Sequence, residues 1–146
     1  MPFIRLPPTL LLIAVSMTTL LPAAQTRILC LGDSITQSDN LHKSYRYNLW
    51  TKLIDAGTEF DFIGSVSSNN GGSPTWPDYL GKAFDRDHEG HWGWRADEIR
   101  ASLPGWLANY TPDIALIHLG SNDLIQFQSV ASTVEEISAT VSNIEA

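Results

Sequence analysis

The sequence predicts an α/β protein, in which helices cover both faces of a parallel sheet. Two continuous apolar runs, at residues 27–31 and 113–119, have the length of strands buried on both sides, and residues 59–66 form a third strand-like run. Segments with apolar residues at helical spacing lie between these runs. The chain has 146 residues, 43% of them hydrophobic, which is enough for one domain with a packed core.

The first 24 residues have the composition of a secretory signal peptide. Arg5 supplies a positive charge, residues 9–21 are apolar, and the small residues Ala23 and Ala24 follow. The apolar stretch is shorter than the about 20 residues that span a bilayer. We therefore expect residues 1–24 to be removed and the protein to be secreted to the extracellular space, with no membrane association afterwards. An uncleaved anchor and a buried N-terminal helix are the alternatives.

The remaining elements follow in order along the chain. A crossover helix is expected after the first strand, because Tyr45 and Leu49 begin an apolar repeat at helical spacing that ends at Gly57. Turn-forming residues then predict a long loop over residues 67–93, and long loops in compact domains are often functional. A second helix is expected from Ala96, with an interruption near Pro104.

The last stretch of the chain, residues 130–146, has apolar residues at alternating spacings of four and three, which predicts an amphipathic helix. Its apolar positions are Val130, Val134, Ile137, Val141 and Ile144.

Charge and cysteine content exclude some functions. The net charge of −7 and the scattered basic residues argue against a nucleic-acid partner, because phosphate binding needs clustered Lys and Arg. With one cysteine, Cys30, the chain cannot form an internal disulfide, and we interpret Cys30 as a small buried hydrophobic residue. Asn109 begins a glycosylation sequon whose use stays open, since Pro112 follows it.

Two polar segments follow apolar strands. In "LGDSIT", Ser34 lies at a sharp turn after the first strand, where its hydroxyl is exposed and Gly32 allows a close backbone approach. In "HLGSND", Asn122 reaches the same carboxyl edge of the sheet, where its amide could bind an oxyanion. Both segments also fit ordinary turn chemistry, so neither alone establishes a catalytic site.

Together, "GDSIT" at 32–36, the glycine of "GHWGWRADEI" at 90–99 and "GSND" at 120–123 resemble the SGNH hydrolases, or GDSL esterase family, in sequence order. "SYRYNLW", "GGSPTWPDYLGKAFDRDHEGHWGW" and "PDIALIHLGSND" resemble secreted fungal members of carbohydrate esterase family 3. The resemblance implies a three-layer α/β/α sandwich of the flavodoxin-like type. It also implies that Ser34 is the nucleophile, that the backbone N–H groups of Ser34 and Gly93 are oxyanion donors, and that Asn122 supplies a side-chain donor. No metal or other cofactor is implied.

The resemblance also implies an Asp-x-x-His element that supplies the general base, and no histidine follows Asn122. We therefore expect residues 25–146 to be the N-terminal portion of such a domain, lacking this element and inactive as a fragment. A sheet of three strands would leave residues 113–119 as an unprotected edge and the chain marginally stable. His88 and His91 are the alternative bases, whereas His118 is interpreted as a buried core histidine.

An acidic segment and a set of aromatic residues each allow two interpretations. The acidic segment 85–91 could suggest a metal site, but its spacing matches no common zinc or calcium loop, and a solvated loop is the alternative. Four aromatic residues either stack on sugar rings or bury the long loop, with burial expected for at least two: Trp76, Tyr79, Trp92 and Trp94.

Three functions fit the sequence. The first is a secreted serine esterase that removes acetyl groups from plant cell-wall polysaccharide, with the acetylated polysaccharide or another ester as its partner. The second is a lipase or acyl esterase on the same fold. The third is a non-catalytic carbohydrate-binding protein that keeps the fold and the aromatic loop but lacks the base. The oligomeric state is left undetermined by the sequence.

Overall fold

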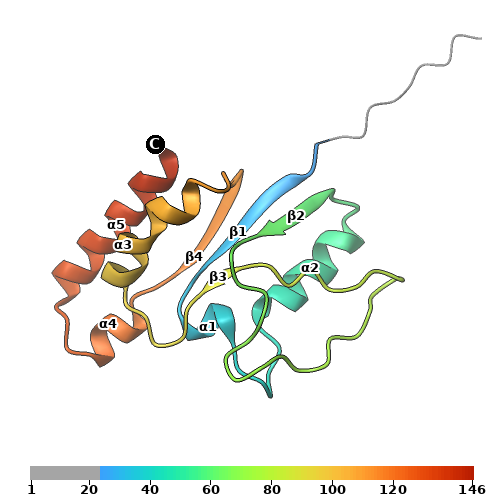
Figure 1. Ribbon diagram of the computed structural model, residues 1–146, viewed down its shortest axis with the longest axis horizontal. Coiled ribbons are helices and arrows are strands. Elements are labelled where there is room, and N and C mark those ends of the chain that lie inside the picture. The colour runs from blue at the N-terminus through green and yellow to red at the C-terminus, as the bar shows by residue number, and fades with distance from the viewer. Residues whose placement is uncertain (1–23) are drawn as a thin grey trace, which may run out of the picture.

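A computed structural model describes residues 24–146 (Figure 1). The signal-peptide prediction concerns residues 1–24 and so lies, except for Ala24, outside the described residues. The described part forms four strands and five helices, in the order β1 Thr26–Gly32, α1 Ser34–Gln37, α2 Tyr45–Asp55, β2 Phe60–Ile63, β3 Glu89–Gly90, α3 Ala96–Leu107, β4 Ile114–His118, α4 Ser121–Ile125 and α5 Val130–Glu145.

The sheet is parallel and is organised around β1. β2 pairs with the first part of β1 and the two-residue β3 pairs with its end, so that Gly32 lies opposite Gly90. β4 pairs with β1 over a register that overlaps both, from Ile28 opposite Ile114 to Gly32 opposite His118. β4 therefore occupies the opposite edge of β1 from β2 and β3. The order β2–β1–β4 is the one expected for a flavodoxin-like sheet.

Two apolar cores lie on opposite faces of the sheet, as the alternation of side chains along β1 requires. Ile28 and Cys30 face α2, where Trp50 and Phe62 complete a cluster. Leu29 and Leu31 pack on the other face against Ile99 and Leu103 of α3, with Ile144 of α5 at the margin. Figure 1 shows α2 on one side of the sheet and α3 and α5 together on the other. The α/β fold and its three layers are thus confirmed.

Most elements lie where the sequence predicts them. α2 is followed by Gly57 with φ of +67°, the left-handed conformation that ends many helices. The strand expected over 59–66 is shorter, because its pairing with β1 stops at Ile63. The expected loop 67–93 contains β3 near its end.

The expected interruption at Pro104 is wrong. α3 continues through Pro104 to Leu107, and the Ala108 N–H donates to the Pro104 carbonyl at 3.2 Å. Pro104 lies on the exposed face of the helix, whereas Leu103, Trp106 and Leu107 pack against the sheet. Burial of these side chains outweighs the single backbone hydrogen bond that proline removes.

β4 is less buried than its apolar sequence predicts, so the expectation of a strand buried on both sides is wrong, whereas the expected unprotected edge is present. Its three middle residues are half-buried and both ends are exposed, with Ile114 46% exposed. Within residues 24–146, the second edge of β4 pairs with no strand. The predicted helix is present as α5, but several of its apolar side chains are exposed, including Val130 at 66% and Val134 at 56%.

None of the helices within residues 24–146 combines the length and the apolar character needed to cross a bilayer.

Candidate active site

The sheet register brings the three predicted site residues to one edge. Gly32, Gly90 and His118 lie at the same level in β1, β3 and β4. Ser34 follows Gly32, Gly93 follows Gly90 and Asn122 follows His118, each by a few residues. Figure 1 accordingly shows α1, α4 and the segment between β3 and α3 at the carboxyl end of the sheet.

Two glycines allow these segments to pack closely. A Cβ atom added to Gly32 would clash with the His118 carbonyl oxygen, and one added to Gly90 would lie 2.5 Å from the Gln37 nitrogen. Because both neighbouring atoms are backbone atoms, a larger residue at either position would force these segments apart. The close packing of the backbone at this edge therefore depends on glycine at both positions.

Ser34 is the first residue of the short helix α1, which Asp33 caps by accepting a hydrogen bond from the Ile35 N–H at 2.9 Å. The Ser34 side chain is half-buried, so its hydroxyl remains reachable. The Ser34 N–H has no acceptor within residues 24–146, because the carbonyls at this turn bind the N–H groups that follow it. This residue therefore presents both a hydroxyl and an unused donor.

Gly93 has φ of +81°, a left-handed conformation that favours glycine. Its carbonyl accepts a hydrogen bond from Gln126 Nε2 at 3.0 Å, and its N–H has no acceptor among the described residues. This hydrogen bond fixes the peptide plane between Gly93 and Trp94. The Gly93 N–H stays available to a ligand.

Asn122 lies in the first turn of α4 and is half-buried. Its Nδ2 donates to the Trp94 carbonyl at 2.8 Å, which uses one of the two amide protons. The second has no acceptor within the described residues. The predicted site residues are thus tied together, since Asn122 contacts the segment that carries Gly93.

Asp123 is a functional neighbour that the sequence analysis did not identify. Both its carboxylate oxygens accept from the Ala96 N–H, at 3.0 and 3.1 Å, and its side chain is fully buried. It therefore caps α3 from another element. The polar pair after a strand was visible in the sequence, but only the fold reveals that Asn122 and Asp123 bind adjacent parts of one segment.

Arg46 holds the far end of α1 and was also missed. Its buried guanidinium donates to the Thr36 carbonyl at 3.0 Å, the Gln37 carbonyl at 3.4 Å, the Arg86 carbonyl at 2.8 Å and Asn69 Oδ1 at 3.4 Å. Burial lowers the pKa of Arg46 to about 10. The residue joins α1, which begins with Ser34, to α2 and to the long loop.

The interpretation of His118 as a core histidine is wrong. Its side chain is 47% exposed, and its Nδ1 lies 3.9 Å from Asp33 Oδ1, next to Ser34. The apolar run suggested burial, but His118 lies at the end of β4 on the side where the described chain provides little cover.

His88 and His91 both take part in interactions away from Ser34. His88 is fully buried, its Nδ1 accepts from the Gly90 N–H at 2.9 Å, and burial lowers its pKa to about 3. His91 Nε2 binds Glu89 at 2.8 Å, and its ring stacks on both Trp94 and Trp106, with centroid distances of 4.4 and 4.7 Å. Neither imidazole is therefore well suited to take a proton from Ser34.

Glu89 organises this second segment from inside the protein. Its wholly buried carboxylate accepts hydrogen bonds from the Ser65 N–H, from the Tyr110 hydroxyl at 2.6 Å and from His91. Burial raises the pKa of Glu89, but these hydrogen bonds outweigh it and leave the pKa below its usual range. The backbone of His91 also donates to the Gly32 carbonyl at 2.9 Å, so this network fixes the approach to Gly93.

No group of three metal-ligating side chains is present within residues 24–146. In the acidic segment, Asp85 instead binds backbone, accepting from the Phe62 N–H at 2.7 Å and the Asp87 N–H at 3.3 Å. Burial raises the pKa of Asp85. Asp85 therefore links the long loop to β2.

Three of the four loop aromatics are packed, which confirms the expected burial. Trp76 stacks on Tyr47 with a centroid distance of 5.4 Å, and Tyr79 packs edge-on against Trp50. Trp94 belongs to the stack around His91. Trp92 differs, since it is 47% exposed.

A half-buried serine at a strand-to-helix turn, together with two unused backbone donors and an asparagine amide at the same sheet edge, is the set of groups that serine hydrolases use. The profile of the GDSL-like Lipase/Acylhydrolase family matches residues 30–146. The chain belongs to this family, and the resemblance seen in the sequence is confirmed.

Solved structures of related proteins agree with this assignment. An acetyl esterase variant crystallised with an acetate ion is 30% identical, with a TM-score of 0.69 over 82% of this chain and 56% of that chain. A carbohydrate esterase family 3 protein from Talaromyces cellulolyticus is 31% identical, with the same TM-score and coverage. A family 3 carbohydrate esterase from Clostridium thermocellum is 29% identical, with a TM-score of 0.61 over 83% of this chain and 59% of that chain.

The chain thus spans just over half the length of these structures. No curated protein matches it.

Proposed function

We propose that this protein is a serine esterase that hydrolyses acetyl esters of polysaccharide, with Ser34 as nucleophile. The observation that carries the proposal is the convergence of Ser34, Gly93 and Asn122 at one sheet edge, with three donors not fully used by the protein itself. Two structural relatives, an acetyl esterase with acetate and a family 3 carbohydrate esterase, support an acetyl group on a sugar as the substrate.

The reaction would proceed in two steps, acylation of Ser34 and hydrolysis of the acyl-enzyme. Ser34 Oγ attacks the acetyl carbonyl carbon, its proton passes to a base, and the sugar oxygen leaves with a proton. Water then attacks acetyl-Ser34, which releases acetate and restores the hydroxyl. In both steps the oxyanion accepts hydrogen bonds from the Ser34 N–H, the Gly93 N–H and Asn122 Nδ2.

The reaction needs a general base. His88 is buried and His91 is bound to Glu89, so neither is the first candidate for that role. His118, half-exposed beside Asp33, becomes the first histidine to test. We propose that full activity depends instead on an Asp-x-x-His element, as the family resemblance implies.

The test compares two proteins, residues 25–146 and the same residues extended by the Asp-x-x-His segment of a relative. We expect the extended protein to hydrolyse a small acetyl ester, Ser34→Ala to abolish the reaction, and Asn122→Ala to lower kcat by about 10²–10³-fold. Circular dichroism checks that each variant is folded. Activity that survives Ser34→Ala would refute the proposal, and activity of the unextended chain that is lost in His118→Ala would assign the base to His118.

A non-catalytic carbohydrate-binding function is the second candidate. It is favoured by one observation, that none of the described histidines forms a hydrogen bond with Ser34. Retention on insoluble xylan, without acetyl-ester hydrolysis by the extended protein, would support it. A lipase function predicts instead that long acyl esters are hydrolysed faster than acetyl esters.

We also propose that the protein is secreted. The charged, apolar and small residues of positions 1–24 support this. Expressed in a eukaryotic host, the protein should be found in the medium with a new amino end near Ala24 or Gln25. A cell-retained product that begins with Met1 would contradict secretion.

A further inference from the structure

The exposed indole of Trp92 lies beside the candidate active site. Trp92 is 47% exposed and has no stacking partner within the described part of the chain. Large aromatic side chains are normally covered, because they carry the largest apolar surface of any residue. Its neighbour Trp94, two positions further on, follows that rule and stacks on His91. The packing of the protein therefore accounts for the position of Trp94 but not for the exposure of Trp92.

The backbone on both sides of Trp92 is held in place. The Trp92 N–H donates to Gln37 Oε1 at 2.8 Å, and Gln37 Nε2 in turn donates to the Ser68 carbonyl at 3.4 Å. Before it, the His91 N–H binds the Gly32 carbonyl at 2.9 Å; after it, the Gly93 carbonyl binds Gln126. The indole is thus carried on a fixed backbone, and a ligand that stacks on it does not have to order a loop.

Trp92 is also connected to both parts of the catalytic arrangement. It directly precedes Gly93, so the two Cα atoms are about 3.8 Å apart. Its backbone partner Gln37 is the last residue of α1, which begins with Ser34, and these two residues are separated by about 4.5 Å along the helix axis. The backbone that carries the exposed Trp92 side chain is therefore tied to the helix that begins with Ser34 and to the residue that supplies an oxyanion donor.

We propose that Trp92 is the stacking platform for the pyranose ring that carries the acetyl ester. This inference rests on the proposed esterase function and adds the sugar subsite to it. The C–H face of a pyranose is apolar and flat enough to cover an indole, while its hydroxyls stay in water. The net charge of −7 disfavours sugars with carboxylate groups, so the ligand is a neutral pyranoside.

The test measures sugar binding without turnover. Calorimetric titration with a neutral acetylated xylo-oligosaccharide uses the full chain with Ser34→Ala, so that the ester stays intact. Adding Trp92→Ala should raise Kd about tenfold or more, while Trp92→Phe should recover part of the affinity. Trp92→Ala keeps the backbone N–H that binds Gln37, and circular dichroism with thermal melting verifies its fold.

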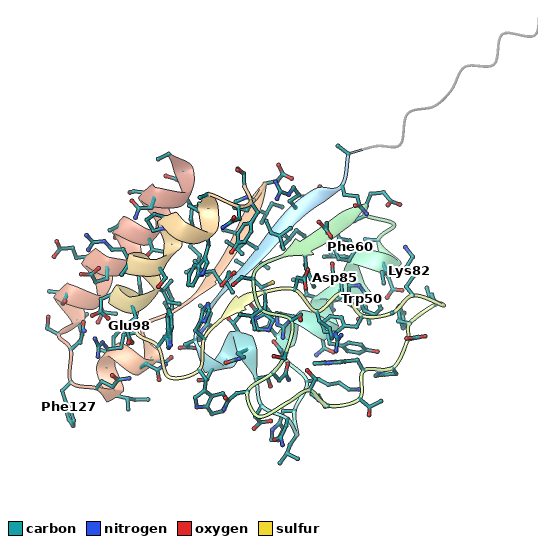
Figure 2. The ribbon with its side chains drawn as sticks, viewed as in Figure 1. Trp50, Phe60, Lys82, Asp85, Glu98 and Phe127 are labelled. Atoms are coloured by element: carbon teal, nitrogen blue, oxygen red, sulfur yellow. The ribbon has the colours of Figure 1, made fainter. Side chains whose placement is uncertain are left out.

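Phe127 provides the matched control for nonspecific aromatic binding. It is 96% exposed, and Figure 2 shows its ring projecting from the connection between α4 and α5, away from the rest of the molecule. Phe127→Ala should leave Kd unchanged. Equal Kd values with and without Trp92, or no measurable affinity of the Ser34→Ala chain, would overturn the platform. Ester hydrolysis by the extended protein is a separate readout, so failure of the esterase proposal would show there.

Discussion

Acid should destabilise this protein through one buried imidazole, that of His88. The side chain is 0% exposed, Nδ1 accepts from the Gly90 N–H, and Nε2 has no hydrogen-bond partner within residues 24–146. Burial, followed by the nearby charge of Arg46, lowers the pKa of His88 from 6.5 to about 3. The folded protein therefore binds a proton at His88 more weakly than the unfolded chain does.

The sign and size of the effect follow from proton linkage. Between pH 6.5 and about 3 the unfolded chain binds a proton that the folded protein does not, so the free energy of unfolding falls as the pH falls. The loss is about 1.4 kcal/mol per pH unit, or about 2 kcal/mol between pH 6.5 and pH 5. That is a large part of the about 5–15 kcal/mol that stabilises a typical domain.

Urea unfolding at pH 7, 6 and 5 tests this reasoning. In His88→Asn an amide oxygen replaces Nδ1 as the acceptor for Gly90, so the variant should lose most of the pH dependence in this range. His42→Asn removes an imidazole whose side chain is 72% exposed, and as the matched control it should keep the wild-type slope. A His88→Asn slope equal to that of the wild type would refute the assignment.

Three further predictions concern stability and solubility. Asp123→Ala leaves the buried Ala96 N–H without its acceptor and should lower the free energy of unfolding by about 2 kcal/mol in urea titrations; an unchanged midpoint would contradict the cap. Cys30, whose pKa burial raises to about 11, should react with iodoacetamide only on unfolding, as followed by mass spectrometry, and rapid native labelling would count against burial. The exposed apolar stripe of α5 and the unpaired edge of β4 should make residues 25–146 self-associate. Val134→Lys should shift sedimentation toward the monomer, whereas Lys52→Arg on the far face should not.

Local periodicity predicted the elements whose burial follows a simple pattern. β1 is buried on both faces and α2 repeats its apolar residues at helical spacing, so both were located correctly. The helix interruption predicted at Pro104 is absent because the local effect of proline is outweighed by the packing of Leu103 and its neighbours. The burial predicted for His118 is wrong because an apolar sequence does not reveal which strands flank it.

Only those residues of the site that belong to sequence motifs could be predicted. The positions of Ser34, Gly93 and Asn122 could be inferred from three ordered blocks. The groups that hold them could not, since their partners are distant in sequence: Arg46 binds Arg86 across 40 positions, and Glu89 binds Tyr110 across 21. Such pairings depend on the completed fold, and the segments that contain Arg46 and Glu89 do not reveal these partners.

The central place of β1 has a consequence during protein synthesis. β1 leaves the ribosome before every strand it pairs with, and Gly32 meets His118 only 118 − 32 = 86 residues later. At about 5–20 residues per second, translation of that interval takes about 4–17 seconds. For most of this interval, until Ala96–Leu107 has been made, Leu29 and Leu31 lack the cover of α3, and until its end the turn that bears Ser34 lacks β4 as a neighbour. The nascent chain therefore carries the apolar residues of β1 uncovered for seconds before the sheet around them is complete.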